Sequence, residues 1–421
     1  GNLSDLSDPH QMKDMDRLVE ILAQKIRKQV RIRIIGDYDV DGVTSSHLFL
    51  TALRRVGAKV DVVIPHRIQD GYGLSLHLLQ QAKEDGVDTI LTCDNGIAAI
   101  DEIAWAKAQK MTVLVTDHHA VPFEEHEGRR TEKKSLADAV VNPHQQDCRY
   151  PYKELCGAGV AWNVIRVLYE NYDMDKREAE DLLDFVAMAT VCDVMSLTGE
   201  NRILVKEGLK RIRHTKNIGL QALMQACNVQ PENISAYHFG YVLGPCVNAT
   251  GRLDTARHAL RLFETGQETE AEEIARDRVD LNQERKELTL QGVEMAKKLC
   301  EEGGYENDPV LVLFLPDVHE SIAGLIAGRI REMYNRPVFV LTRGEEGVKG
   351  SGRSTENYSM YENMCGCAEL FTKFGGHPMA AGLSLPEENV EKFRRKINEN
   401  CPLTVEEVCP DIHIDMAMPV G

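Results

Sequence analysis

Residues 36–42 read Gly36-Asp37-Tyr38-Asp39-Val40-Asp41-Gly42, directly after the apolar run Ile32–Ile35. The apolar run predicts a buried strand, and three carboxylates follow it at every second residue. In an extended segment these carboxylates share one face, where like charges repel unless a cation lies among them. One interpretation is a divalent metal site, because hard cations bind carboxylate oxygens. The other is an acidic turn between a strand and a helix.

Acidic and histidine side chains also follow later predicted strands. Asp94 comes soon after the third strand pattern, and Asp117-His118-His119 follows the fourth. Strand patterns that alternate with helical patterns are typical of a doubly wound parallel sheet, whose ligands bind outside the carboxyl ends of the strands. We therefore expect these side chains to meet at one edge of such a sheet. The strand patterns cover residues 31–35, 60–65, 89–92, 112–115 and 139–141.

The fold class that we predict is α/β, with a larger domain followed by a smaller one. Residues 1–255 form the first domain, which holds the doubly wound parallel sheet and a mainly helical insert at 155–255. Residues 256–302 carry a long charged helical pattern and read as a connecting helix or helix pair. Residues 303–410 form a second, smaller α/β domain, and 411–421 read as the start of a further region.

Composition narrows the class of protein. The chain has 421 residues, of which 43% are hydrophobic and 27% charged, as in ordinary globular proteins. Its net charge of −17 argues against binding polyanions over the whole surface, so any contact with nucleic acid has to be local. The 11 cysteines lack the spacing of a disulfide framework, no secretory signal is visible, and no stretch is long and apolar enough to span a bilayer. We expect a cytoplasmic protein without a membrane partner.

The acidic and histidine residues together suit a site for two divalent metal ions, which lie roughly 3.5–4 Å apart in such sites. Asp94, from a neighbouring strand, is the candidate for a bridging ligand. Mixed imidazole and carboxylate ligands favour Mn²⁺ over Mg²⁺. The set consists of Asp37, Asp39, Asp94, His118, His119 and, after a buried helical pattern at 177–190, Asp193.

The two histidines are adjacent, so in an extended segment their rings point in opposite directions. One interpretation is that one ring binds metal and the other meets the phosphate or the leaving group. The alternative is that one of the two is a hydrogen-bonded histidine of the core.

Three further stretches carry candidate substrate contacts. Gly375-Gly376-His377 suits close approach of the backbone to a phosphate or sugar, or is an ordinary glycine turn. Arg353, between Gly352 and Ser354, suits a phosphate contact, or lies in a surface hairpin. Arg252 is the single cation of the predicted loop 244–252.

These motifs resemble the DHH phosphoesterase superfamily and, within it, the RecJ exonucleases. The resemblance rests first on residues 36–42, on Asp117-His118-His119 and on Phe374-Gly375-Gly376-His377-Pro378. It covers nearly the whole chain in the same order. Further motifs that carry it are residues 70–74, 93–96, 157–161, 248–252 and 319–324, together with Asp193.

The resemblance implies roles for individual residues. Residues 1–255 would be the DHH catalytic domain, with His119 acting on the scissile phosphate and Asp41 supporting its loop. Arg252, in the motif that begins at Asn248, would contact substrate near the metals. In the DHH-associated domain, at 303–410, the end of the nucleic-acid substrate would be held by Arg353, Ser354, Gly375, Gly376 and His377. The metal ligands would be Asp37, Asp39, Asp94, His118 and Asp193.

The sequence departs from the family pattern at three places. Ile35 stands where RecJ proteins often carry a histidine, and Cys246 stands where they often carry an arginine. The chain stops at Gly421, about where an OB-fold that grips single-stranded DNA would begin. We therefore expect weaker and less processive DNA binding than in proteins with that domain.

The function that the resemblance implies is metal-dependent hydrolysis of single-stranded DNA from the 5′ end, with release of mononucleotides, in DNA repair and recombination. Repair or replication proteins would then be partners besides the single-stranded nucleic acid. The alternative is a hydrolase of short substrates, such as nanoRNA, 3′-phosphoadenosine-5′-phosphate or cyclic dinucleotides. A third reading is a scaffold without activity, which would lack metal ligands that this chain keeps.

Overall fold

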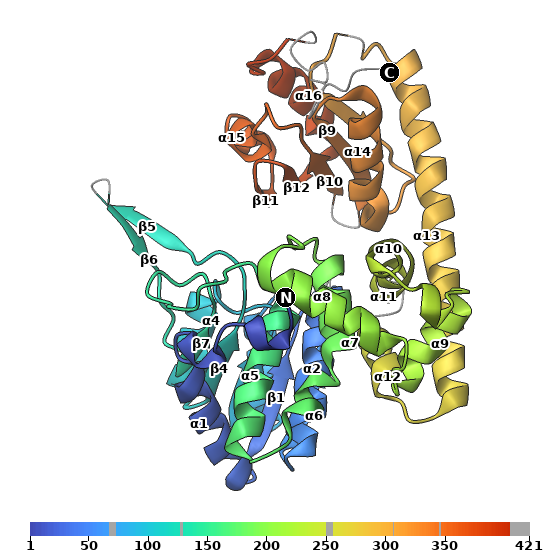
Figure 1. Ribbon diagram of the computed structural model, residues 1–421. Coiled ribbons are helices and arrows are strands. Elements are labelled where there is room, and N and C mark those ends of the chain that lie inside the picture. The colour runs from blue at the N-terminus through green and yellow to red at the C-terminus, as the bar shows by residue number, and fades with distance from the viewer. Residues whose placement is uncertain (67–72, 127–128, 250–255, 306, 345–346, 405–421) are drawn as a thin grey trace, which may run out of the picture. The chain divides into compact units, whose positions relative to one another are not determined.

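The computed structural model describes residues 1–66, 73–126, 129–249, 256–305, 307–344 and 347–404 (Figure 1). The chain divides into two compact units, Gly1–Asn282 and Gln283–Gly421. The division falls inside one helix, α13 (Glu268–Glu302). The predicted strand at 411–416 and most of the stretch 70–74 lie outside the described residues.

The first unit is built on a parallel sheet of five strands in the order β2-β1-β3-β4-β7. Neighbouring strands pair in parallel throughout, so the predicted parallel sheet is confirmed. Each strand except β2 is short and almost entirely buried, which explains its apolar sequence. The strands are β1 (Arg31–Ile35), β2 (Lys59–Val63), β3 (Thr89–Thr92), β4 (Thr112–Thr116) and β7 (Ala139–Val141).

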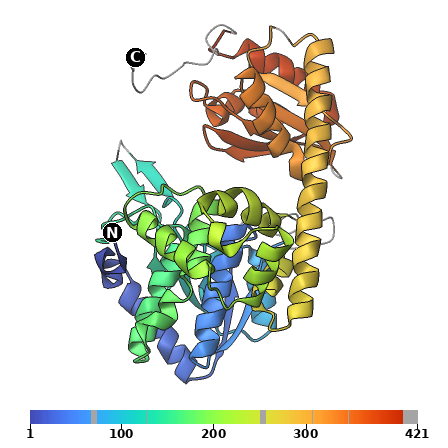
Figure 2. The same cartoon turned by 45° about the vertical axis from the view of Figure 1, so that its right-hand side comes forward.

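Helices cover both faces of this sheet, as a doubly wound fold requires (Figure 2). Ile34 of β1 lies in a core cluster with α1 (Met15–Arg27), α2 (Val40–Arg55) and α5 (Gly157–Asn171). Ile35, on the other face, lies in a cluster with α3 and α4. Those two helices span Leu76–Glu84 and Ile100–Ala108.

The helical part of the first unit differs from prediction at two places. The predicted helix 177–190 is broken at Asp181–Leu182 into α6 (Lys176–Glu180) and α7 (Leu183–Cys192). Of the predicted loop 244–252, residues Gly244–Asn248 form helix α11. Pro245 stands in the first turn of α11, where its missing N–H leaves no helical hydrogen bond unmade.

The remaining helices of this part follow one another with short connections. A π-helical turn, Phe239–Leu243, joins α10 to α11, and a short 3₁₀ turn covers Pro231–Asn233. Two further 3₁₀ turns precede α1, at Leu3–Asp5 and Pro9–Gln11. The helices are α8 (Gly199–Ile212), α9 (Ile218–Ala226), α10 (Ala236–His238), α11 (Gly244–Asn248) and α12 (Ala256–Glu264).

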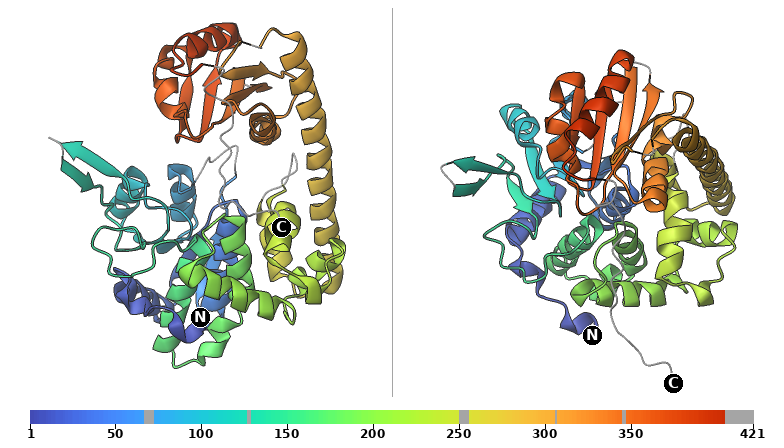
Figure 3. Two further views of the ribbon diagram at one scale, coloured as in Figure 1. Left: turned by 45° about the horizontal axis from the view of Figure 1, so that its top comes forward. Right: turned by 90° about the horizontal axis from the view of Figure 1, so that it is seen from above.

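A two-stranded hairpin in the first unit was not predicted. β5 (Phe123–His126) pairs antiparallel with β6 (Arg129–Glu132), and the hairpin extends away from the parallel sheet (Figure 3, left). Both strands are rich in charged residues and have no apolar alternation, so the pattern that predicts strands is absent.

The second unit is a five-stranded mixed sheet in the order β11-β12-β10-β9-β8. β8 and β9 are parallel and the other pairs antiparallel. Helix α14 (Glu320–Tyr334) and the end of α13 pack on one face, while α15 (Met360–Cys365) and α16 (Val390–Glu399) cover the other (Figure 3, right). The strands span Leu311–Phe314, Val338–Gly344, Gly347–Arg353, Lys373–Gly376 and Ala380–Leu385.

The two glycine-rich stretches that carry Arg353 and Gly375 lie largely in β10 and β11. Their many glycines hide the strand pattern, and packing explains part of this composition. A Cβ atom on Gly352 would lie 2.3 Å from Met360 Sδ, so only glycine fits there. The predicted second α/β unit is otherwise confirmed.

None of the helices among the described residues is long and apolar enough to cross a membrane. No disulfide joins the cysteines that the structure describes.

Candidate metal centre

The predicted ligands stand at the ends of strands and helices of the first unit. Asp37 follows β1, and Asp39 is the N-cap of α2, where its Oδ1 accepts a hydrogen bond of 2.8 Å from the N–H of Gly42. Asp94 follows β3 in the left-handed region, with φ of 58°. Asp193 is the C-cap of α7.

Helix α2 begins at Val40, so the expectation of three carboxylates on one extended face is wrong. Asp41 lies in the first helical turn and has a different task. Its Oδ2 and Oδ1 accept hydrogen bonds of 2.6 and 2.8 Å from the N–H groups of Gly157 and Ala158, at the start of α5. A carboxylate is favourable at a helix N-terminus, so Asp41 fastens α2 to α5 beneath the site.

Gly157 is required by this arrangement. A Cβ atom on Gly157 would lie 2.7 Å from Asp94 Cβ and 2.9 Å from Asp41 Oδ2. The missing side chain therefore allows α5 to start directly against the Asp94 carboxylate.

The candidate ligands form three overlapping groups, in each of which the ligand atoms lie within 4.8 Å of one another. Asp94 and His118 each belong to two of the groups, and of these two residues Asp94 has the two oxygens that a bridging ligand needs. The groups are Asp37 with Asp39 and Asp94, Asp94 with His118 and His119, and Asp41 with His118 and Asp193.

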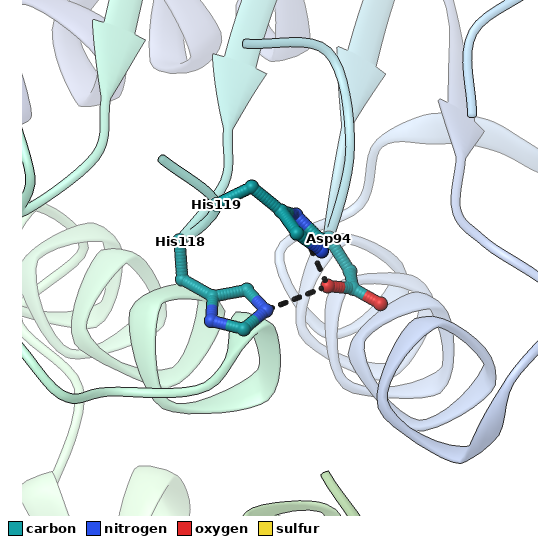
Figure 4. A group of neighbouring side chains, drawn as sticks. All are labelled: Asp94, His118 and His119. Carbon is teal, nitrogen blue, oxygen red and sulfur yellow. Dashed lines mark hydrogen bonds and ion pairs between the residues drawn. The ribbon is translucent and has the colours of Figure 1, made fainter. Parts of the chain in front are cut away.

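Both histidines after β4 approach Asp94 (Figure 4). Asp94 Oδ1 lies 3.1 Å from His118 Nε2 and 3.9 Å from His119 Nδ1. The two rings are 4.5 Å apart between centroids, so the expectation that they point in opposite directions is wrong. The strand ends at Thr116, and the alternation of an extended segment no longer applies beyond it.

Asp117 is a positioning residue that the sequence analysis did not single out. It is buried, and its Oδ1 accepts a hydrogen bond of 2.6 Å from His119 Nδ1, while Oδ2 accepts one of 2.9 Å from the N–H of Ile97. Burial lowers the pKa of His119, but the hydrogen bond and charge of Asp117 outweigh it and raise this pKa to about 9. The sequence did offer a signal for Asp117, which is an acidic residue at the end of a buried strand and directly before two histidines.

The acidic groups crowd one another. Burial, followed by the charges of Asp41 and Asp39, raises the pKa of Asp94 well above its usual range and that of Asp193 to about 8. Asp94 Oδ2 is buried and accepts no hydrogen bond from the part of the chain that the structure describes. A buried carboxylate oxygen among like charges is matched by a divalent cation, so these residues fit a metal ion.

The other predicted site residues are distributed between both units. Asn248 is the exposed last residue of α11, and Arg252 lies outside the described residues. In the second unit, five residues gather at one end of the sheet, because Arg353 pairs with Ala380 and Gly376 pairs with Ala381. We call Arg353, Ser354, Gly375, Gly376 and His377 the second-unit sheet end.

Comparison with protein families agrees with this geometry. Residues 31–190 match the model of the DHH family N-terminal domain, and residues 307–401 match that of the DHHA1 domain. The single-stranded-DNA-specific exonuclease RecJ of Haemophilus influenzae is 36% identical over 415 residues, which cover 94% of this chain and 70% of that protein. The chain belongs to the RecJ family.

The RecJ relatives differ in how much longer they are than this chain. The RecJ of Bacillus subtilis is 34% identical, and the match covers 98% of this chain but 51% of that protein. The chain therefore spans between half and about two thirds of the length of these relatives.

Solved RecJ structures share the fold and contain metal. A crystal structure of exonuclease RecJ bound to manganese superposes with a TM-score of 0.79 at 32% identity, covering 92% of this chain and 94% of that one. RecJ of Thermus thermophilus in complex with Mn²⁺ gives a TM-score of 0.77 at 30% identity, and the match covers 92% of this chain and 54% of that one. The same protein has also been solved with Mg²⁺.

Proposed function

We propose that this chain hydrolyses single-stranded DNA with divalent metal ions, acting from the 5′ end and releasing mononucleotides. The observation that carries the proposal is the position of Asp94, whose carboxylate lies in two of the three ligand groups of a chain of the RecJ family. A carboxylate shared between two groups suits two metal ions that together hold one phosphate.

The ligands that would hold these ions are the five carried over from the family. Metal ions there would polarise the scissile phosphate and lower the pKa of an attacking water. The imidazole among the carboxylates favours Mn²⁺ over Mg²⁺. The proposed ligands are Asp37, Asp39, Asp94, His118 and Asp193.

His119 is the proposed catalytic residue that acts on the scissile phosphate. Asp117 holds the Nδ1 side of its ring through the 2.6 Å hydrogen bond, so Nε2 is the atom that meets the phosphate. The hydrogen bond and charge of Asp117 raise the pKa of His119 and so favour the protonated ring, which can donate a proton to a phosphate oxygen or to the leaving group.

The second-unit sheet end would bind parts of the DNA substrate other than the scissile phosphate. Arg353 offers a guanidinium for a phosphate, and Gly375 and Gly376 expose their backbone beside it. Asn248 and Arg252 would contact substrate from the first unit. We accordingly assign the catalytic part to residues 1–255, the connecting helices to 256–302 and substrate binding to 303–410.

The test is hydrolysis of a 5′-phosphorylated single-stranded oligonucleotide with Mn²⁺, with the parent beside Asp94→Asn. Asparagine tolerates the left-handed backbone of this position and removes only the charge. The matched control is Asp147→Asn, which removes an exposed carboxylate paired with Lys13. Mononucleotides from the 5′ end are expected with the parent and the control and not with Asp94→Asn.

A different product pattern would contradict the proposal and indicate another function. If the parent clears dinucleotides and leaves long strands intact, it is a hydrolase of short substrates. Equal activity in Asp94→Asn would place the chemistry elsewhere. A RecJ-type activity would act in the cytoplasm during DNA repair and recombination, which fits the absence of disulfides among the described cysteines.

A further inference from the structure

Two exposed tyrosines of the first unit stack on each other. The side chains of Tyr237 and Tyr241 are 62% and 70% exposed. Their ring centroids are 5.1 Å apart and their planes are inclined by 26°. Each ring thus covers part of its neighbour and leaves its outer face in solvent. Large side chains this exposed contribute little to the core.

The backbone beneath the tyrosines holds them in this arrangement. Tyr237 lies in α10 and Tyr241 in the π-helical turn that follows, four residues apart and so on one side of the helix. Phe239 and Leu243, also in this turn, are fully buried. Short π-helical turns occur frequently at functional sites. The pair therefore stands on a support that is packed into the core.

This support packs against the helix end that carries Asp193. Cys192 Sγ donates a hydrogen bond of 3.3 Å to the carbonyl oxygen of Phe239. A Cβ atom on Gly240 would lie 3.4 Å from Val191, and one on Gly244 would lie 2.4 Å from Cys192 Sγ. Val191 and Cys192 directly precede Asp193, which joins His118 in a ligand group. The tyrosine pair and the metal centre thus share one helix end.

We propose that Tyr237 and Tyr241 form a base-stacking platform that receives nucleobases of the single-stranded substrate beside the metal centre. The proposal rests on the proposed function for the nature of the substrate. Aromatic rings stack on any base, so a platform binds a strand without regard to its sequence. With a net charge of −17, the surface as a whole repels the phosphate backbone, and stacking supplies attraction that does not depend on charge.

The first test measures binding of a fluorescent oligothymidylate without divalent metal, so that the strand stays intact. The double variant Tyr237→Ala/Tyr241→Ala is expected to bind about tenfold more weakly, since stacking contributes about 1–3 kcal/mol per base. Tyr237→Phe/Tyr241→Phe keeps both rings and is expected to bind like the parent. Equal binding by the alanine and phenylalanine variants would overturn the proposal.

An abasic strand shows whether the rings contact bases. The parent should bind an abasic strand of the same length about tenfold more weakly than the oligothymidylate. In the double alanine variant this difference should disappear, because its platform is already missing. An abasic penalty of equal size in both proteins would show that the bases are bound elsewhere and would also overturn the proposal.

Turnover separates this proposal from the proposed function. With Mn²⁺, the double alanine variant should lose activity on long strands through a higher KM and keep that on bis(p-nitrophenyl) phosphate, which has no base. If the parent cuts strands but the binding results are negative, the exonuclease stands and the platform fails. If the parent binds strands as described but cuts none, the platform stands and the proposed function fails.

Discussion

The metal centre of the first unit and the second-unit sheet end satisfy their polar groups in different ways. Around Asp94, buried carboxylates repel one another, and one carboxylate oxygen accepts no hydrogen bond from the described residues. At the second-unit sheet end, Ser354 Oγ donates a hydrogen bond of 2.6 Å to the carbonyl oxygen of Tyr358. The N–H of His377 donates one of 2.8 Å to the carbonyl oxygen of Ala380. The first region is thus incomplete without a cation, whereas these two groups of the second region find their partners within the chain.

The two sheets explain this difference. In the parallel sheet all carboxyl ends of the strands lie at one edge, so residues from β1, β3 and β4 are brought together there. In the second sheet most neighbours are antiparallel, and one end gathers the last residues of β10 and β11 with the first of β12. In the function that we propose, the first sheet acts through charges that converge and the second through the exposed backbone of its glycines.

Among residues that are not proposed metal ligands, the largest effect that we predict comes from the positioning residue of the metal centre. Asp117→Asn should lower kcat about 100-fold, because changes of this kind beside a ligand typically cost 10–100-fold, and KM should change little. The pH profile should also shift, because the pKa of His119 falls when the charge of Asp117 is removed. A variant with the parent's kcat and pH profile would show that Asp117 does not act through His119.

A pair of glycine variants tests how tightly the metal centre is closed. Gly157→Ala places a Cβ atom 2.7 Å from Asp94 and should destabilise the first unit by about 1–3 kcal/mol while weakening Mn²⁺ binding. Gly159→Ala, two residues on in α5, has its nearest described contact at 3.4 Å and should be tolerated. Thermal unfolding and Mn²⁺ titration of both variants give the comparison. Equal behaviour would show that α5 can shift freely.

The same design applies to the second-unit sheet end. Gly376 has φ of 154°, and a Cβ atom there would lie 2.4 Å from the carbonyl oxygen of Ala380. Gly376→Ala should therefore cost about 1–3 kcal/mol and weaken binding of long strands, while turnover of bis(p-nitrophenyl) phosphate stays at the parent's level. Gly375→Ala meets no described atom within 4 Å and is the matched control for the effect on stability. Lost turnover of the small ester in Gly376→Ala would contradict the division of tasks between the regions.

A further effect concerns pH and distinguishes the two regions without a mutation. The pKa of Asp193 is about 8 in the folded chain, above its value near 4 in an unfolded one, so the folded state holds the proton more tightly. The stability of the metal-free first unit should therefore fall as pH rises from about 4 to about 8, by at most about 1.4 kcal/mol per pH unit for one proton.

Mn²⁺ should remove this fall, because the ion takes the place of the proton. Hydrogen exchange in β1 and β3, measured with and without Mn²⁺ across this pH range, reports on the first unit, and exchange in β9 reports on the second. An equal response of β9 would contradict the contrast between the two regions.

The sequence was most informative where a residue's role follows from its place after an apolar strand. Asp37, Asp94 and His118 were predicted together because alternating strands and helices imply one shared sheet edge. Asp193 could be suspected only as the residue after a buried helix. That it reaches His118, at 3.5 Å, depends on how α7 packs, which no local pattern encodes.

Other features depended on packing that short patterns do not reveal. The role of Asp41 follows from the start of α2 at Val40, whereas the spacing of the three carboxylates indicated an extended segment. Strand β10 was obscured by its glycines, of which Gly352 makes room for Met360. The pair Tyr237 and Tyr241 gave no signal, because neither residue belongs to an apolar period that marks a core helix.

The central claim is that the acidic and histidine cluster at the strand ends binds divalent metal through Asp94. Calorimetric titration of Mn²⁺ into the parent and into Asp94→Asn tests it most directly. We predict two ions per chain for the parent and, for the variant, loss of at least one ion or a large drop in affinity for both. Unchanged stoichiometry and affinity in Asp94→Asn would contradict the account.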